Sequence, residues 1–116
     1  MKELHSEQCV PCRGTETPLS EQEIEELRED VPDWDVVDTE KTPKLRRRFR
    51  VADFRRAMNL ANQIGEIAEA ANHHPRIVVE WGRVSVSWWT HAIGGLHRND
   101  FIMAARTDRF AQGAAR

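Results

Sequence analysis

The spacing of apolar residues alternates between a helical and a strand period along this 116-residue chain, and this pattern most limits what the chain can fold into. In the first apolar segment, Ile24, Leu27 and Val31 lie three or four residues apart, as on one face of an amphipathic helix. Ser20 and Glu23 have the spacing of a capping box, in which each side chain binds the other residue's backbone N–H. The sequence therefore predicts a short first helix that begins just after Ser20.

Alternation of apolar and polar residues follows this helix and predicts two hairpins. Leu45 and Phe49 share one face of an expected strand, and arginines occupy the opposite face. The same period returns in residues 77–81 and 84–89, which are joined around Gly82. Four strands are therefore expected, in two sequential pairs.

A longer helix is predicted between the two hairpins. Its main apolar stripe is expected at Phe54, Met58, Ala61, Gly65, Ala68 and Asn72, widened by Ala57, Ile64 and Ala71. Pro75 disfavours helical geometry at His74, so this helix should end just before His73. A last helix is expected to begin at Asn99.

These elements predict an α+β fold: a four-stranded antiparallel sheet with helices packed on one face, in the order α-β-β-α-β-β-α. Residues 19–116 are expected to form this domain. Residues 1–18 are polar and contain glycine and proline, so we expect a flexible arm rather than part of the core. Trp88 and Trp89 are consecutive in a strand and must point to opposite faces, so the second face also needs cover, which indicates association of subunits.

Charge and hydropathy limit the partners. The 17 basic and 19 acidic residues give a net charge of −2, so no broad attraction to nucleic acid or to an anionic membrane is expected. No apolar run approaches the roughly 20 residues of a membrane span, and the N-terminal residues lack the apolar core of a secretion signal. We therefore expect a cytoplasmic protein that acts on a small molecule or binds another protein.

The residues best suited to carry chemistry are concentrated in one segment. They are Glu69, His73, His74, Pro75, Trp81, His91 and Asp100. Imidazole gives and takes protons near neutral pH, so three imidazoles in one short segment indicate acid–base catalysis. The order and spacing of these residues, together with the tail from Trp88 to Phe101, resemble the pterin-4a-carbinolamine dehydratase family, in the bacterial form associated with phenylalanine hydroxylase.

The resemblance implies a hydro-lyase that removes water from 4a-hydroxytetrahydrobiopterin and leaves quinonoid dihydropterin, which recycles the cofactor of an aromatic amino-acid hydroxylase. It implies His73 and His91 as the acid–base pair and His74 as a contact to the substrate. An acid must protonate the departing 4a-hydroxyl and a base must accept the proton from N5, and imidazoles suffice for both, so no cofactor is expected. The resemblance also implies a homodimer or homotetramer paired through the sheets, with phenylalanine hydroxylase as a functional partner.

Three further residues are candidates for binding or orienting the substrate. Glu69 lies one helical turn before His73, where its carboxylate could orient an imidazole or hold the polar edge of a pterin. Asp100 could support His91 from the first turn of the last helix, although an acidic residue there favours the helix without any catalysis. Trp81 is expected to pack at the hairpin turn, with stacking on a bicyclic ligand as the alternative.

Other polar residues have simpler interpretations. Cys9 and Cys12 supply only two of the four ligands of a structural zinc site, so metal binding would need histidines or a second chain and is a minor alternative. The strand arginines fit a solvated face better than an anion site. His5 and His97 lie outside the motif and are expected to be exposed.

Three alternative functions remain open. The first is a paralogous enzyme that acts on another pterin, such as one of molybdenum-cofactor metabolism. The second is a non-catalytic dimerisation or regulatory partner protein, a role that the resemblance implies because animal members of the family also have it. The third is a metal-binding regulator that uses the cysteines of the arm.

Overall fold

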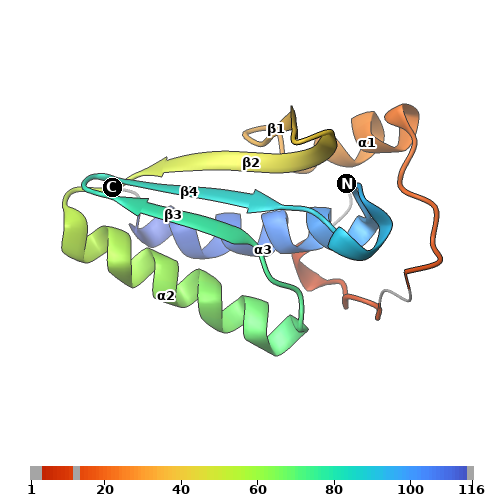
Figure 1. Ribbon diagram of the computed structural model, residues 1–116. Helices are drawn as coiled ribbons and strands as arrows, with labels where there is room; N and C mark the ends of the chain where they lie inside the picture. The colour runs from red at the N-terminus through yellow and green to blue at the C-terminus, as the bar shows by residue number, and fades with distance from the viewer. Residues whose placement is uncertain (1–3, 12–13, 115–116) are drawn as a thin grey trace.

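The computed structural model describes residues 4–11 and 14–114, and it places a four-stranded sheet over helices (Figure 1). In chain order the elements are η1 (Leu4–Ser6), α1 (Glu21–Arg28), β1 (Asp35–Thr39), β2 (Thr42–Arg50), α2 (Phe54–Ala71), β3 (Arg76–Glu80), β4 (Arg83–Trp88), η2 (His91–Ile93) and α3 (Arg98–Ala114). The predicted α+β class and the predicted order of helices and strands are confirmed. Of the helices in the described ranges, none is long and apolar enough to cross a membrane.

The sheet is antiparallel throughout and has the strand order β1-β2-β4-β3, so the two hairpins meet where β2 pairs with β4. In this central pair, Leu45 lies opposite Trp88 and Phe49 opposite Val84. All four of these side chains are buried. The register therefore places these four apolar residues of β2 and β4 on one face of the sheet.

The core lies between this face and the helices α2 and α3, which both cover it (Figure 1). Its largest fully buried side chains come from the sheet, both helices and the loops. They are Trp34, Trp88, Phe49, Phe101, Leu4, Leu45, Leu60, Ile64, Leu96, Ile102, Met103 and Val31. Helix α3 contacts β2 and β4, and its first turn lies close to the residues that follow β4, since the Thr90 hydroxyl binds Asp100.

The two adjacent tryptophans point to opposite faces, as predicted. Trp88 is fully buried, whereas Trp89 is only partly buried on the open face. The ammonium group of Lys44 lies 4.4 Å from the centre of the Trp89 ring, and the His91 ring lies 4.5 Å from it. The side chains of Lys44 and His91 therefore cover part of Trp89 without a second subunit.

Helix α2 buries only part of the predicted stripe, namely Ala57, Ile64 and Ala68, together with Leu60, which was not predicted. Phe54 and Met58, which headed the predicted main stripe, are 49% and 41% exposed. The core therefore takes the side of the helix that contains Leu60 and Ile64.

The N-terminal arm packs on α3, and the prediction that it stays outside the core is wrong for Leu4. Leu4 is 1% exposed and belongs to the core. The guanidinium group of Arg98 donates two hydrogen bonds to the Glu7 carboxylate, at 2.9 and 2.8 Å. Arg106 donates to the backbone carbonyl oxygens of His5 and Glu7. A single apolar residue among polar ones carries no periodic signal, which is why the sequence did not indicate this packing.

Candidate active site

Helix α2 ends immediately before the histidine pair because Asn72 adopts a left-handed backbone conformation, with φ 52° and ψ 42°. Asparagine tolerates this conformation better than most residues, and it is a common helix terminator. The N–H group of His73 then binds the carbonyl oxygen of Ala68 at 3.1 Å, which satisfies the last turn of the helix. The predicted helix end before Pro75 is confirmed, and the chain turns sharply at the two histidines.

His73 is held by a buried carboxylate. Its Nε2 lies 2.6 Å from Oδ1 of Asp100, and the side chains are 13% and 0% exposed. The imidazole also stacks on the buried indole of Trp88, with ring centres 5.7 Å apart and an angle of 14° between the planes. Two independent contacts therefore fix the plane and the direction of the His73 ring.

The other oxygen of Asp100 accepts two more hydrogen bonds. The hydroxyl of Thr90 and the backbone N–H of His97 both donate to Oδ2 at 2.9 Å. With both oxygens acting as acceptors, Nε2 of a neutral His73 ring carries the proton and Nδ1 carries the lone pair. Asp100 thus contacts His73 rather than His91, the partner expected from the sequence, and it reaches the chain at His91 only through Thr90.

His91 is the first residue of η2 and is exposed. The turn that carries it is closed by the Thr90 N–H, which binds the carbonyl oxygen of Gly95 at 2.9 Å. Its ring lies against that of Trp89 at an angle of 49°. The structure therefore links His91 to the buried carboxylate through its chain neighbour and leaves its ring open to solvent.

Glu69 binds His74 rather than His73. The distance between Oε1 of Glu69 and Nε2 of His74 is 2.7 Å, and the side chains are 77% and 55% exposed. A contact this exposed is screened by water and contributes little energy. Glu69 thus orients an imidazole, as expected, but that imidazole is not the buried one.

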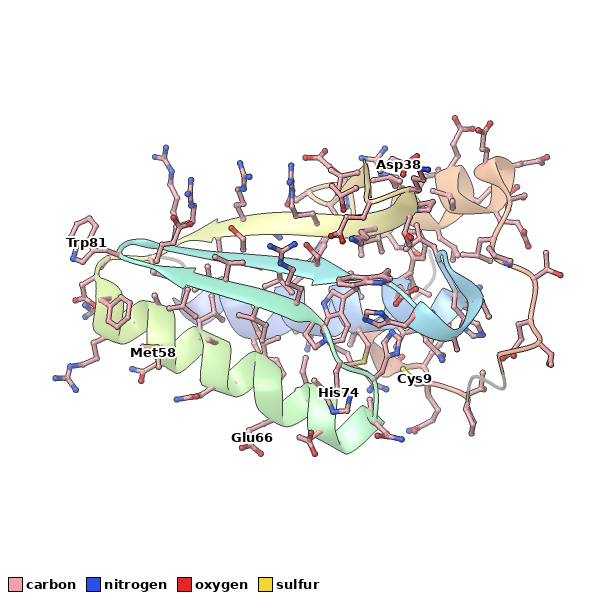
Figure 2. All side chains as sticks on the ribbon, viewed as in Figure 1. Cys9, Asp38, Met58, Glu66, His74 and Trp81 are labelled. Atoms are coloured by element: carbon pink, nitrogen blue, oxygen red, sulfur yellow. The ribbon has the colours of Figure 1, made fainter. Side chains whose placement is uncertain are left out.

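Trp81 neither packs at the hairpin turn nor lies near the histidines. It is 75% exposed. Figure 2 shows Trp81 and His74 at opposite ends of the sheet, separated by the length of β3. The predicted packing at the turn is therefore wrong, because the side chain is mostly exposed. The alternative, stacking on a ligand beside the histidines, is also wrong within this chain, because the strand between Trp81 and the histidines spans about 16 Å.

A cavity of about 250 Å³ lies beside His73. Its lining residues come from the arm, the end of α2 and the start of α3: Cys9, Val10, Pro11, Ala71, Asn72, His73 and Asn99. His74 and His91 are not among the residues that line it. Of the three motif histidines, His73 alone contributes to this cavity.

The thiol of Cys9 is partly buried at this cavity. Burial raises its pKa, while the positive charge of Arg106 lowers it and the negative charge of Asp100 raises it further. Within residues 4–11 and 14–114, no group of three His, Cys, Asp or Glu side chains is placed to hold a metal ion. Cys12 lies outside the described residues, so the zinc alternative stays a prediction.

Sequence reasoning missed three residues that shape this region. Thr90 and Asn99 are both buried, and each directly precedes a motif residue, which was the available signal. His97 was expected to be exposed, but its side chain is only 12% exposed. Its Nδ1 accepts the backbone N–H of Asn99 at 3.0 Å.

Comparison with known proteins gives a consistent picture. Residues 17–110 match the model of the family described as pterin 4 alpha carbinolamine dehydratase. The chain is 55% identical to a candidate pterin-4-alpha-carbinolamine dehydratase of Chlorobium limicola over 97% of this chain and the whole of that protein. It is 51% identical to a similarly named protein of Gloeobacter violaceus over 93% of each chain.

Solved structures agree with these relatives. The crystal structure of a transcriptional coactivator/pterin dehydratase from Brucella melitensis matches with a TM-score of 0.74 and 29% identity, over 82% of this chain and 99% of that one. A pterin dehydratase-like protein described as a RuBisCO assembly factor in the alpha-carboxysome matches with a TM-score of 0.57 over 68% of this chain and 89% of that one. At 19% identity, the second likeness shows a shared fold alone.

Proposed function

Because the chain belongs to the pterin-4a-carbinolamine dehydratase family, we propose that it is an enzyme that dehydrates 4a-hydroxytetrahydrobiopterin to quinonoid dihydropterin. One observation carries the proposal. A motif histidine, His73, lies beside a cavity with its ring fixed by a buried carboxylate at 2.6 Å. An imidazole held in one orientation and one tautomer is suited to repeated proton transfer.

The proposed reaction needs two proton transfers. A base removes the proton from N5 of the substrate, the nitrogen forms a double bond to C4a, and the C4a–oxygen bond breaks as an acid protonates the departing hydroxyl. In our proposal Nδ1 of His73 is the base, because Asp100 occupies Nε2. His91 is the acid, and His74, held by Glu69, contacts the substrate. Neither step changes the oxidation state of the protein or requires a further cofactor.

The substrate class implies a source. A 4a-hydroxytetrahydropterin forms when an aromatic amino-acid hydroxylase uses its reduced pterin, so the proposed function is recycling of that cofactor. We propose phenylalanine hydroxylase as the functional partner and the cytoplasm as the location.

We also propose that the protein is a homodimer or homotetramer. Three large apolar side chains lie exposed on the N-terminal half of α2 and on the β3–β4 turn: Phe54, Met58 and Trp81. Figure 2 shows Met58 and Trp81 toward the same end of the molecule. Clustered exposure of this kind is typical of interaction surfaces. Met58→Glu should lower the mass measured by light scattering, Gln63→Glu on the same helix should not, and a monomeric wild type would refute the proposal.

A stopped-flow assay tests the enzymatic proposal directly. The carbinolamine is generated by a hydroxylase, and its loss is followed by absorbance with and without the protein. His73→Gln should lower kcat by roughly 10²- to 10⁴-fold, the range typical of a general acid or base. His5→Gln is the matched control, because it changes a histidine outside the motif. Wild-type turnover by the His73 variant would remove His73 from the acid–base role, and no acceleration by the folded wild type would favour a non-catalytic partner protein.

A further inference from the structure

The N-terminal arm forms one wall of the cavity beside His73. Cys9, Val10 and Pro11 line it together with the end of α2. Figure 2 shows Cys9 and His74 toward the same end of the sheet, away from Trp81. Residues 9–11, which are remote in the sequence from the motif, therefore complete a cavity whose other lining residues lie in or next to the motif.

Three consecutive residues at the start of α3 hold this arrangement together. Arg98 binds Glu7 of the arm through two hydrogen bonds. Asn99 binds the backbone of Val10 twice: its Oδ1 accepts the Val10 N–H at 3.0 Å, and its Nδ2 donates to the Val10 carbonyl oxygen at 2.6 Å. Asp100 binds His73. One helical turn therefore fixes both the arm and the candidate base.

The role of Asn99 follows from its burial and its partners. The residue is 3% exposed, and both ends of its amide are used by a single arm residue. An asparagine that pairs with a backbone N–H and C=O in this way acts like a short piece of β-ladder. It therefore positions the arm, and its amide makes no other hydrogen bond within the described part of the chain.

We propose that residues 9–11 are a wall of the pterin-binding site and that Asn99 is the positioning residue that holds this wall opposite His73. The inference rests on the proposed function and extends it to a segment outside the motif. The lining combines apolar groups of Val10, Pro11 and Ala71 with the polar groups of Asn72 and His73. This combination suits a flat heterocycle with apolar faces and a polar edge.

The size and construction of the cavity support this assignment. Its volume of about 250 Å³ is slightly below the roughly 300–1,000 Å³ of most small-molecule sites, so in our proposal it holds the part of the pterin next to His73, and His74 and His91 contact the part outside it. The arm is fastened by contacts within the chain, namely Leu4 in the core and the hydrogen bonds from α3. A wall that is already ordered costs little entropy on binding, so losing it should weaken binding more than chemistry.

The first test fills the cavity without releasing the arm. Val10 is 56% exposed and is held through its backbone, so Val10→Trp keeps the Asn99 contacts and occupies space beside His73. The Kd for tetrahydrobiopterin, measured by calorimetry, and the KM for the carbinolamine should both rise roughly tenfold, while kcat changes less. Gln8→Trp is the matched control, because Gln8 is an exposed arm residue that does not line the cavity. Constants within twofold of wild type for the Val10 variant would overturn the inference.

The second test releases the arm. Asn99→Ala should raise KM by roughly fivefold or more with a smaller change in kcat, and the pH profile of kcat should keep its shape because Asp100 and His73 remain paired. Thermal unfolding of the same variant shows whether the protein is folded at the assay temperature. A fall in kcat with unchanged KM would assign Asn99 to the chemistry instead and overturn the inference.

A third measurement needs no catalysis. In a Cys12→Ser variant, bound tetrahydrobiopterin should slow the alkylation of Cys9 by iodoacetamide, because Cys9 lines the same cavity. Unchanged alkylation at saturating pterin would overturn the inference. The proposed function and the further inference can be refuted separately. If the wild type dehydrates the substrate and Val10→Trp changes nothing, only the further inference is refuted. If the wild type neither binds nor dehydrates pterin, both are refuted.

Discussion

Replacing Asp100 with asparagine should lower kcat for dehydration by roughly 10²- to 10⁴-fold without unfolding the protein. The substitution keeps the shape of a side chain that is 0% exposed and exchanges one oxygen acceptor for an NH₂ donor. Two donors, the Thr90 hydroxyl and the His97 N–H, converge on Oδ2, so the amide oxygen should settle there. The NH₂ group then faces Nε2 of His73.

This geometry reverses the tautomer of His73. Opposite an NH₂ group, Nε2 must accept a hydrogen bond, so Nδ1 of a neutral ring carries the proton and can no longer act as a base. Hydrogen bonds to charged groups contribute about 1.5–3 kcal/mol, and the new N–H···N contact replaces part of this, so the free energy of unfolding should fall by about 1–2 kcal/mol. A domain of this size typically has about 5–15 kcal/mol of stability, so the variant should remain folded.

The assay is stopped-flow dehydration, paired with denaturant unfolding of the same samples. Glu69→Gln is the matched control, because it also changes a carboxylate bound to a histidine, at 2.7 Å, but in a pair that is 77% and 55% exposed. Its kcat should fall by no more than about threefold, since exposed pairs are screened. Equal effects of the two variants on kcat, or wild-type turnover by Asp100→Asn, would refute the argument that burial and tautomer decide the role of His73.

Three further changes test the structure around the site. Leu4→Ala should lower the free energy of unfolding by about 3 kcal/mol, because Leu4 is 1% exposed, and a loss below about 1 kcal/mol in denaturant titration would contradict the packing of the arm. Glu23→Gln should remove the pH dependence that the capping box gives to the stability. The pKa of Glu23 is lowered because its carboxylate accepts the Ser20 N–H, so the stabilisation by this carboxylate is present at neutral pH and is lost as the pH falls through the folded-state pKa; a variant whose stability falls toward acid pH as much as that of the wild type would contradict it. In the Cys12→Ser variant, alkylation of Cys9 near pH 8 should be slower than that of a free thiol and should accelerate toward higher pH, since burial raises its pKa.

The parts of the fold that depend on local sequence were predictable. The capping box of Ser20 and Glu23, the end of α2 before Pro75 and the opposite faces of Trp88 and Trp89 all follow from spacing along a few residues. The order of strands and helices followed from the period of the apolar residues. Each of these features is decided by neighbours in the chain, so no knowledge of tertiary contacts was needed.

The parts that depend on tertiary packing were not predictable. On helix α2, only the shape of the core decides that Leu60 is buried while Phe54 and Met58 are exposed. The partner of Asp100 could not be known either, because sheet order decides which histidine comes within reach. The burial of Leu4 could not be predicted either, because it depends on tertiary contacts with α3 and the core.

The three motif histidines lie in different surroundings, and under the proposed function these surroundings suit them to different roles. His73 is held by a stacked indole and a buried carboxylate, so it can take a proton without first reorganising. His91 is exposed, so water reaches its ring, which suits a group that must be reprotonated after each turnover. Asp100→Asn changes the group that binds His73 and keeps an oxygen opposite Thr90, the neighbour of His91, so it disturbs the proton transfer at His73 alone. His91→Gln disturbs the other transfer, so each variant should lose kcat by roughly 10²- to 10⁴-fold, and wild-type turnover by either variant would contradict this assignment of roles.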